Sequence, residues 1–553
     1  MTENDQIGKS IYDSLEQIRG KLEPTRFRDI FFPLFFLLFA SKKFELAEKK
    51  EIETKEKLAG VSSYILQEAL NSDTFNRQGI LYIPKKARWE QIVEADKTGS
   101  LFSAISSAFS MIYNENDKNK FNNFEFLFKE INQSNVSASN LSLIVNLFNK
   151  KIWIDNKDNI TLENIDDHFG KIYEYLIYHY GDKTNDNAGE FYTPSSIIDL
   201  LVNFLDIQPQ KKIYDPCCGS GGMFIRSLNY INKVYKDDLE KKKRALNPSE
   251  FLEFVPAEFY GQEINQNTIS ICWSGLIING IIPKLGNDDT FKNYFHQDQV
   301  GQIDYVLANP PFNLTLNEKE YPSWGSDPRW IFLVPSTKNA NLAWIQHIYY
   351  YLRKDGGKAA VILSKDSASS PDSIDIETRR KIIESGCIQA MLFLPENLFF
   401  NTGISVCVWF LKRDVNKTND KILILSYPEG GESESKKISY LTPSEIKNLK
   451  EIYFKYLNGQ LEKEGSSVIY KQYKCEWKIL TIEEVLTDNP DCSLTPGTFN
   501  IEENIDLSED LEVDEIPFEP GNEENVLLKE IKEMQPWLKE LSESKKNFDD
   551  FLI

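Results

Sequence analysis

An Asn-Pro-Pro-Phe tetrapeptide is the segment of this 553-residue chain whose residue types point most directly to chemistry. It comprises Asn309, Pro310, Pro311 and Phe312, and it follows residues 303–308, a largely apolar run that predicts a buried strand. Two consecutive prolines cannot donate to a β-ladder, so they end the strand and fix a rigid turn at its carboxyl end. Because open α/β sheets bind their ligands at that edge, the turn is a candidate catalytic site.

The groups of this turn are suited to activating an amine. The Asn309 carboxamide oxygen and the Pro310 carbonyl oxygen can both accept hydrogen bonds from one planar amino group. Holding both amino hydrogens favours a pyramidal nitrogen, whose lone pair can then attack an electrophilic methyl group. Phe312 can stack on the ring that carries the amine. These residues therefore predict methyl transfer to an amino group without a strong base.

A glycine-rich turn earlier in the chain is the second candidate site. Residues 212–225 read Lys-Ile-Tyr-Asp-Pro-Cys-Cys-Gly-Ser-Gly-Gly-Met-Phe-Ile, which predicts a strand, a tight turn and an apolar helix. Glycines permit positive φ and let a ligand approach the backbone, while the start of the helix presents N–H groups. The order Gly-x-Gly-Gly differs from the dinucleotide fingerprint, and the pattern also fits an ordinary αβ turn. The nucleotide-type cofactor contacts that it predicts are Asp215, Gly219, Ser220, Gly221 and Gly222.

A carboxylate ends the next predicted strand. Residues 259–263 read Phe-Tyr-Gly-Gln-Glu. A carboxylate at the carboxyl end of a neighbouring parallel strand can accept hydrogen bonds from both hydroxyls of a ribose. Glu263 lies further from Asp215 than the roughly 20 residues of a compact nucleotide-binding unit, which we attribute to an insertion at residues 235–254.

The rest of the chain predicts an α/β domain with helical flanks. Residues 166–415 alternate short β-rich runs with longer segments, as in a parallel sheet covered by helices. Residues 1–165 repeat apolar positions at spacings of three and four, which predicts a helical N-terminal domain. After a C-terminal extension at residues 416–501, residues 502–525 are strongly acidic and hold no Lys or Arg, whereas residues 526–553 recover a helical stripe. We expect the acidic segment to be a linker and the last helix to dock on a partner.

The composition is that of a large globular protein with a surplus of acid. Asp and Glu number 84 against 63 Lys and Arg, a formal net charge of −21. This balance disfavours a free-standing protein that coats nucleic acid, because such affinity comes from cations that neutralise phosphates. Seven cysteines without a Cys-x-x-Cys pair predict neither a disulfide framework nor a zinc site. With no export signal and no membrane-length apolar run, we expect a cytoplasmic, metal-free protein.

Together these segments resemble S-adenosylmethionine-dependent DNA adenine methyltransferases, in particular the methylation subunits of type I restriction-modification systems. The resemblance spans nearly the whole chain and is strongest over residues 165–412. The catalytic Asn-Pro-Pro-Phe is identical, and Gly-Glu-Phe-Tyr-Thr-Pro at residues 189–194 resembles the family segment that lines the cofactor site. The order of the motifs, with this segment first and the catalytic turn last, matches the γ arrangement of amino-methyltransferases.

The resemblance implies a Rossmann-like S-adenosylmethionine-dependent methyltransferase sheet, with an N-terminal helical domain and a C-terminal helical tail. It implies that S-adenosyl-L-methionine is the cofactor and that the exocyclic N6 of adenine, flipped out of a specific duplex sequence, is methylated. The catalytic residues would be those of the tetrapeptide. The cofactor would be bound by Glu190, Phe191, Tyr192, Thr193, Pro194, Ser195, Asp215, Gly219, Ser220, Gly221, Gly222, Glu263 and Asp289.

The same resemblance implies partners. They are a separate DNA-specificity subunit, a second copy of the methylation subunit, a restriction/translocase subunit and double-stranded DNA, with no role for a membrane. Asp289 precedes Thr290 as the family's adenine-contacting acid does, although Asp288 leaves this assignment ambiguous by one position.

Three other functions share some of these residues. Cytosine-carbon methylation needs a cysteine nucleophile on a Pro-Cys turn, but Pro216 and Cys217 lie in the cofactor turn. Protein glutamine methyltransferases use a related Asn-Pro-Pro turn, usually closed by Tyr, and are shorter chains. A cofactor-binding assembly subunit without catalysis would not need the intact tetrapeptide. A set of aromatic residues after the turn either walls a flipped-base pocket or packs in the core: Trp324, Trp330, Phe332 and Trp344.

Overall fold

The computed structural model describes residues 3–20, 24–59, 71–76, 78–116, 137–181, 193–245, 256–396, 398–399, 405–414, 420–435, 438–470, 473–487 and 489–500. All of them belong to one compact unit, Met1–Glu503. The predicted acidic linker (502–525) and terminal helix (526–553) lie outside the described residues. So do three of the predicted cofactor residues, Glu190, Phe191 and Tyr192.

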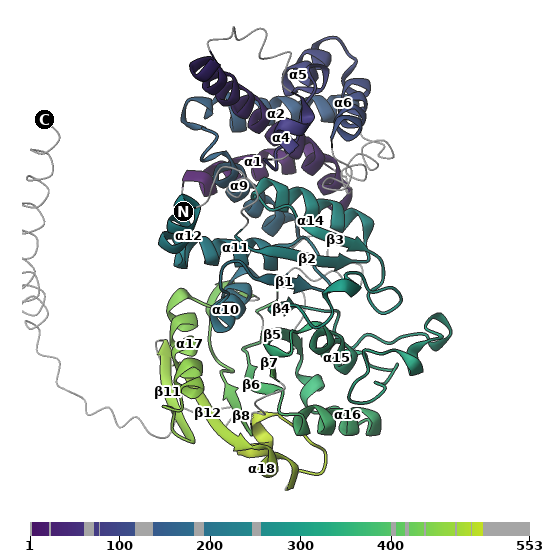
Figure 1. The fold of residues 1–553 in the computed structure, drawn as a ribbon, viewed down its shortest axis with the longest axis vertical. Coiled ribbons are helices and arrows are strands. Elements are labelled where there is room, and N and C mark those ends of the chain that lie inside the picture. Colours follow the sequence, from purple (N-terminus) through teal and green to yellow (C-terminus); the bar gives the residue numbers. More distant parts are fainter. Residues whose placement is uncertain are drawn as a thin grey trace, which may run out of the picture. The chain divides into compact units, whose positions relative to one another are not determined.

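The N-terminal region is helical, as predicted, and is drawn in purple and blue in Figure 1. The apolar run 30–40 lies within one helix of this region, and it is buried although it carries Pro33. No helix in the described part of the chain combines the length and the apolar character needed to cross a membrane. The helices are α1 (Glu3–Arg19), α2 (Pro24–Ala59), α4 (Ser72–Asn76), α5 (Trp89–Lys97), α6 (Leu101–Glu115), α8 (Ala138–Leu147) and α9 (Ile165–Gly181), with the shorter η1 (Lys85–Ala87), η2 (Phe148–Ile154) and η3 (Lys157–Asn159).

A ten-stranded sheet forms the centre of the α/β part, in the order β11-β12-β8-β6-β7-β5-β4-β1-β2-β3. Figure 1 shows most of these strands in this order. The bounds are β1 (Lys212–Asp215), β2 (Glu258–Glu263), β3 (Lys284–Asn287), β4 (Tyr305–Ala308), β5 (Asp355–Ser364), β6 (Ile388–Phe393), β7 (Val406–Asp414), β8 (Lys421–Ser426), β11 (Glu464–Tyr470) and β12 (Tyr473–Thr481), with a separate pair β9 (Glu432–Ser435) and β10 (Ile438–Tyr440).

The strand directions confirm the expected α/β sheet and add two reversed strands, β7 and β12, of which β12 is antiparallel to β8 and β11. The neighbours β3, β2, β1, β4 and β5 pair in parallel. Strand β7 is antiparallel to both of its neighbours, β5 and β6. The segment at 416–501, expected as an extension, supplies β8, β12 and β11 to this same sheet. The sheet therefore continues past residue 415.

Helices cover both faces of the sheet, which makes three layers (Figure 1). One core lies under α10 (Ser195–Leu205), α11 (Gly222–Val234), α14 (Gln266–Ile278) and α17 (Pro443–Leu457). The other lies under α15 (Asn341–Tyr351) and α16 (Ser373–Glu384). Alternate residues of β4 serve the two cores, Leu307 the first and Val306 the second. Because β4 is buried on both faces, the turn that follows it starts from a rigid base.

The remaining described helices are short or peripheral. They are α12 (Lys236–Ala245), α18 (Ile482–Thr487), η4 (Gln297–Gln299), η5 (Glu318–Glu320), η6 (Trp324–Ser326), η7 (Lys365–Ala368) and η8 (Pro496–Phe499).

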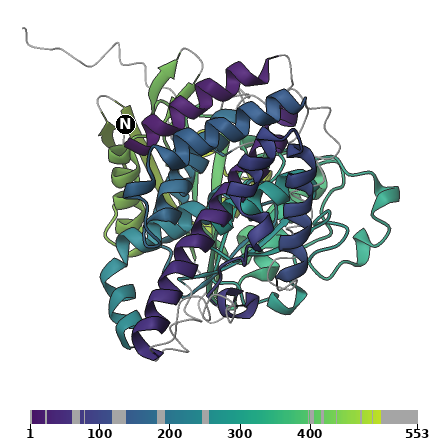
Figure 2. The ribbon, with the colours of Figure 1, turned by 90° about the horizontal axis from the view of Figure 1, so that it is seen from above.

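The helical region is attached to the sheet through α14. Phe36 of α2 packs on Trp273 with 5.5 Å between the ring centroids. The Tyr173 hydroxyl of α9 donates to the Ile271 carbonyl at 2.6 Å. At Gly275 a Cβ would lie 2.4 Å from the Tyr173 ring, so this helix crossing requires glycine. Figure 2, viewed from above, shows the N-terminal helices in front of the sheet.

Candidate active site

The candidate residues gather at the carboxyl ends of four adjacent strands. Asp215 ends β1, Glu263 ends β2, Asp289 follows β3 and Asn309 follows β4. The order β4-β1-β2-β3 makes these strands consecutive, and parallel strands end at a common edge. The structure thus brings all four side chains to the edge where the sequence predicted ligands.

The glycine turn is open on one side and packed on the other. Gly219 and Gly221 have φ of +52° and +85°, and Gly221 is the N-cap of α11. Among the described residues, a Cβ on Gly219 would meet nothing within 4 Å, whereas one on Gly221 would lie 2.9 Å from Cys272 Sγ. The Gly219 N–H donates to Glu263 Oε2 at 3.1 Å, so the turn and the predicted ribose-binding carboxylate are in direct contact. This arrangement fits a nucleoside that lies over the Gly219 side.

A pocket of about 290 Å³ lies beside this turn. Three predicted cofactor residues, Ser195, Ser220 and Gly222, line it. Residues of α9, among them Glu174 and His179, form another part of its wall. The helical N-terminal region therefore contributes to the same pocket as the glycine turn.

The Asn309 carboxamide is held at one end and presented at the other. Its Nδ2 donates to Thr193 Oγ1 at 2.9 Å. Its Oδ1 is buried and, within the described residues, has no hydrogen-bond partner. Leaving a buried acceptor unsatisfied costs about 1–3 kcal/mol, so a ligand donor is the natural partner for this atom. Thr193 and Asn309, which were predicted for different roles, therefore form one unit.

The backbone after the tetrapeptide is anchored from behind. Asn313 has a φ of +53°. Its Oδ1 accepts from Asn341 Nδ2 at 2.8 Å and from Ser364 Oγ at 3.0 Å. Phe312 is half-buried and meets Phe399 edge-on at 6.1 Å. These contacts tie the turn to α15 and β5.

Asp215 is a buried carboxyl group at the end of β1. It is 2% exposed, and its Oδ1 accepts from the Cys217 N–H at 3.0 Å. Burial raises the pKa of Asp215 to about 7; the contacts with Cys217 oppose this rise, and the charge of Glu263 adds to it. Burial and the same two carboxyl groups raise the pKa of Cys217 well above its ordinary value. The Cys217 thiol thus stays protonated and is unsuited to the nucleophilic role that cytosine-carbon methylation requires.

We expect the Asp215→Asn variant to become more stable relative to the wild type as the pH rises from about 4 to about 7. A folded pKa above the unfolded value means that the wild type loses stability over this window, whereas the amide does not titrate. The full difference is on the order of 2–4 kcal/mol. Thermal melting of both proteins at pH 5 and pH 8 measures it. A difference in Tm that does not change with pH would contradict the buried, protonated carboxyl group.

The Asp289 carboxylate is held both by its own turn and by a residue distant in the sequence. Its Oδ1 accepts from the Phe291 N–H at 2.8 Å, and its Oδ2 accepts from the Tyr321 hydroxyl at 2.7 Å. The carboxylate of Asp288 instead accepts from the Asp289 N–H and from Asn293 Nδ2, so it closes the local turn. Of the two candidates, Asp289 is the one positioned by a distant segment.

The aromatic set after the catalytic turn divides between two cores. Trp324, Trp330 and Trp344 are buried together with Phe291. Phe332 packs instead beside Tyr349, with 5.2 Å between the ring centroids. The tryptophans therefore form a packed cluster, which supports the core interpretation for these three.

The sequence assigned no positioning role to three residues that contact the predicted residues or their neighbours in the chain. Cys217 donates to Asp215, Tyr321 donates to Asp289, and Arg329 contacts the two residues that follow Asp289. Of the three, only Arg329 stands out in the sequence, as a single arginine next to a tryptophan in residues 327–330, Asp-Pro-Arg-Trp.

Comparisons with known proteins show which family the chain resembles in sequence. Residues 164–502 match the N-6 DNA methylase family, and residues 7–169 match the HsdM N-terminal domain. The chain is 28% identical over 436 residues to the type I restriction enzyme HindI methylase subunit of Haemophilus influenzae, covering 75% of this chain and 89% of the relative. It is 26% identical over 529 residues to the MjaIX methylase subunit of Methanocaldococcus jannaschii, covering 91% and 84%.

A solved structure of a similar protein has the same fold. A type I restriction-modification methyltransferase subunit from Streptococcus thermophilus superposes with a TM-score of 0.69 at 20% identity, over 89% of this chain and 99% of that one. The N-6 DNA methylase match covers more than half of the chain, including the glycine turn and the tetrapeptide. The chain therefore belongs to the N-6 DNA methylase family of adenine-specific DNA methyltransferases.

Proposed function

We propose that the chain is the methylation subunit of a type I restriction-modification complex, with S-adenosyl-L-methionine as the methyl donor and adenine N6 in a specific DNA sequence as the acceptor. The observation that carries the catalytic part is the buried Asn309 Oδ1 without a partner among the described residues. The names of the relatives and the HsdM N-terminal match support the subunit assignment.

In this proposal Asn309 and Pro310 hold the amino group of the flipped adenine. Asn309 Oδ1 and the Pro310 carbonyl each accept one of its hydrogens, which localises the lone pair on nitrogen. Thr193 keeps the carboxamide from rotating, because it accepts from Nδ2. Phe312 stacks on the base, and Pro311 keeps the turn rigid. When bound, the cofactor supplies an electrophilic methyl group.

The residues at the neighbouring strand ends fit this cofactor. We assign the ribose hydroxyls to Glu263, whose carboxylate is held by the Gly219 and Asn265 N–H groups. We assign the 6-amino group of the cofactor's adenine to Asp289. We assign the methionine part of the cofactor to the pocket beside Ser195, Ser220 and Gly222. Asp215, Gly221, Thr193 and Pro194 shape the site, with Glu190, Phe191 and Tyr192 assigned by the resemblance alone.

We infer the partners from the net charge of the chain and from the type I restriction enzymes to which its relatives belong. An acidic chain with a net charge of −21 is a poor sole binder of a polyanion. We therefore assign sequence-specific DNA contacts mainly to a separate specificity subunit, and include a second methylation subunit and a restriction/translocase subunit in the complete assembly.

The function is tested by identifying the methylated product. The full chain, co-expressed with a specificity subunit from an adjacent gene, is incubated with isotope-labelled S-adenosylmethionine and unmethylated duplex DNA, and the nucleosides are separated after digestion. We expect the label in N6-methyladenine. Label in 5-methylcytosine, label in protein glutamine, or no transfer by a folded complex would each overturn the proposal.

The purified chain alone is expected to lack selective DNA binding. In a gel-shift assay at physiological salt, duplexes with and without the methylated site should bind equally and weakly, at about 10⁻⁶ M or above. Adding the specificity subunit should tighten binding to the cognate duplex by at least about 10³-fold. Tight, selective binding by the chain alone would contradict the division of labour between subunits.

A further inference from the structure

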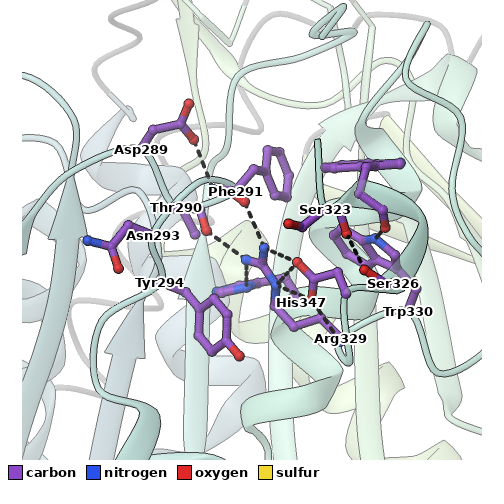
Figure 3. A network of polar contacts seen from close by, with 12 residues as sticks. Asp289, Thr290, Phe291, Asn293, Tyr294, Ser323, Ser326, Arg329, Trp330 and His347 are labelled. Atoms are coloured by element: carbon purple, nitrogen blue, oxygen red, sulfur yellow. Dashed lines mark hydrogen bonds and ion pairs between the residues drawn. The ribbon is translucent and has the colours of Figure 1, made fainter. Parts of the chain in front are cut away.

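Arg329 is fully buried, and all five of its N–H donors are engaged (Figure 3). Nε donates to Asp327 Oδ1 at 2.9 Å, and Nη2 donates to Asp327 Oδ2 at 2.5 Å and to the Phe291 carbonyl at 2.9 Å. Nη1 donates to the Thr290 carbonyl at 2.6 Å and to His347 Nδ1 at 3.1 Å. A guanidinium has five N–H groups, so none is left for a substrate. Arg329 therefore acts through the groups that it holds.

The two carbonyls that Arg329 holds belong to the residues directly after Asp289. The same short segment is tied to the glycine turn, because Thr290 Oγ1 donates to the Pro216 carbonyl at 2.6 Å. It is also tied to the segment after the catalytic turn, because Tyr321 donates to Asp289. The backbone that carries the Asp289 carboxylate is thus fixed from three directions, and Arg329 supplies two of the hydrogen bonds.

The histidine partner extends the network to β1. Arginine only donates, so His347 Nδ1 must accept. Burial and the Arg329 charge lower the pKa of His347 well below its usual range, so the ring is neutral and its proton lies on Nε2. Nε2 lies 3.0 Å from the Tyr214 hydroxyl, and Tyr214 directly precedes Asp215. One guanidinium therefore links the segment after β3 to the strand that carries the cofactor turn.

A gain in folding stability is a weak explanation for the burial of the Arg329 guanidinium. A buried ion pair is often no more stabilising than well-packed apolar residues of similar volume. The guanidinium is also enclosed by aromatic rings, 4.4 Å from the centroid of Tyr294 and 5.1 Å from that of Trp330. What an apolar replacement could not do is hold two adjacent carbonyls at fixed positions.

We propose that Arg329 is a positioning residue that fixes the Asp289 carboxylate and thereby sets the selectivity of the site for the adenine of its cofactor. This inference rests on the proposed function, since it takes Asp289 as the acceptor for the adenine 6-amino group. A carboxylate held in place accepts from an amino group and repels a carbonyl oxygen. A carboxylate that is free to turn discriminates between them poorly.

The test compares S-adenosylhomocysteine with S-inosylhomocysteine, in which a 6-oxo group replaces the 6-amino group and N1 carries a proton. Isothermal titration calorimetry on the full chain gives both dissociation constants. We expect the wild type to prefer the adenosyl ligand by at least about 100-fold. In Arg329→Lys, which keeps the charge but loses the planar set of donors, the preference should fall below about tenfold.

Arg379→Lys is the matched control. Arg379 is also fully buried and also donates to backbone carbonyls, but to those of Ser370, Asp491 and Cys492. It should lose comparable thermal stability and keep the wild-type preference. A folded Arg329→Lys variant that keeps the full preference overturns the inference. If Arg329→Lys does not fold, Asp327→Asn, which removes the charge partner, is judged by the same criterion.

Asp289→Asn separates this inference from the function on which it rests. If the wild type prefers the adenosyl ligand and Asp289→Asn loses the preference while the Arg329 variant keeps it, the role of Arg329 is wrong and the cofactor site stands. If the wild type shows no preference, the assignment of Asp289 is wrong. If neither ligand binds the wild type, the proposed cofactor site itself fails.

Discussion

Asn309→Ala is expected to lower the rate of methyl transfer by at least about 10³-fold and to change cofactor affinity by less than about threefold. The rate falls because alanine removes a hydrogen-bond acceptor for the reacting amine. One such preorganised group contributes about 10²–10³ to the rate. Poorer orientation of the base lowers the rate further. The affinity changes little because we assign the nucleoside to the glycine turn, Glu263 and Asp289, and the Asn309 side chain belongs to none of them.

Both quantities are measured on one preparation, the transfer rate with labelled S-adenosylmethionine in the assembled complex and the affinity by calorimetry. Asn317→Ala is the control, since Asn317 is an exposed carboxamide further along the same segment. It should leave the rate unchanged. An Asn309→Ala variant with more than about a tenth of the wild-type rate would refute the catalytic assignment.

Gly221→Asp is expected to weaken cofactor binding by at least about 100-fold. At a φ of +85° the new Cβ would lie 2.9 Å from Cys272 Sγ and 3.4 Å from Leu276 Cγ, so the turn must shift. The new carboxylate would also be forced into the packed contact with Cys272 and Leu276. Burying an uncompensated charge costs several kcal/mol, and each 1.4 kcal/mol is about tenfold in affinity. Calorimetry with S-adenosylhomocysteine measures the loss.

Gly219→Ala separates backbone strain from the loss of cofactor space. Gly219 also has positive φ, so alanine costs about 1–2 kcal/mol of strain there. Among the described residues its Cβ would meet no neighbour, so the melting temperature should fall only slightly. If the cofactor lies over this side of the turn, affinity for S-adenosylhomocysteine should still fall at least about tenfold. Unchanged affinity in Gly219→Ala would move the cofactor away from Gly219.

The local motifs of this site could be predicted because each depends on neighbouring residues. Two prolines after an apolar run must end a strand, and β4 ends at Ala308, directly before Asn309. Two of the three glycines after Asp215, Gly219 and Gly221, have positive φ, as a tight strand-to-helix turn demands. Parallel pairing then places the strand ends at a common edge. Residue types and their order along the chain were enough to predict the catalytic turn and to place it at the same edge of the sheet as Asp215 and Glu263.

The direction of β7 could not be predicted in the same way. A central strand that is buried on both faces is apolar whether it runs parallel or antiparallel, so residues 405–411 predict a strand without its direction. The same holds for residues 416–501, where local patterns weaken but β8, β11 and β12 extend the central sheet. Strand partners are chosen by packing between segments that lie far apart in the sequence.

By itself, therefore, the sequence determined where the strands end and which two turns carry the candidate catalytic and cofactor residues, because strand ends and glycine conformations are local properties. Only the tertiary structure determined which contacts fix these side chains and how burial shifts their pKa values. The bond from Asn309 to Thr193 joins residues 116 positions apart, and Arg329 clamps carbonyls 38 and 39 positions away. The raised pKa of Asp215 depends on burial by the surrounding fold. Such long-range contacts leave no period in the sequence, since they arise only when separate strands and loops pack together.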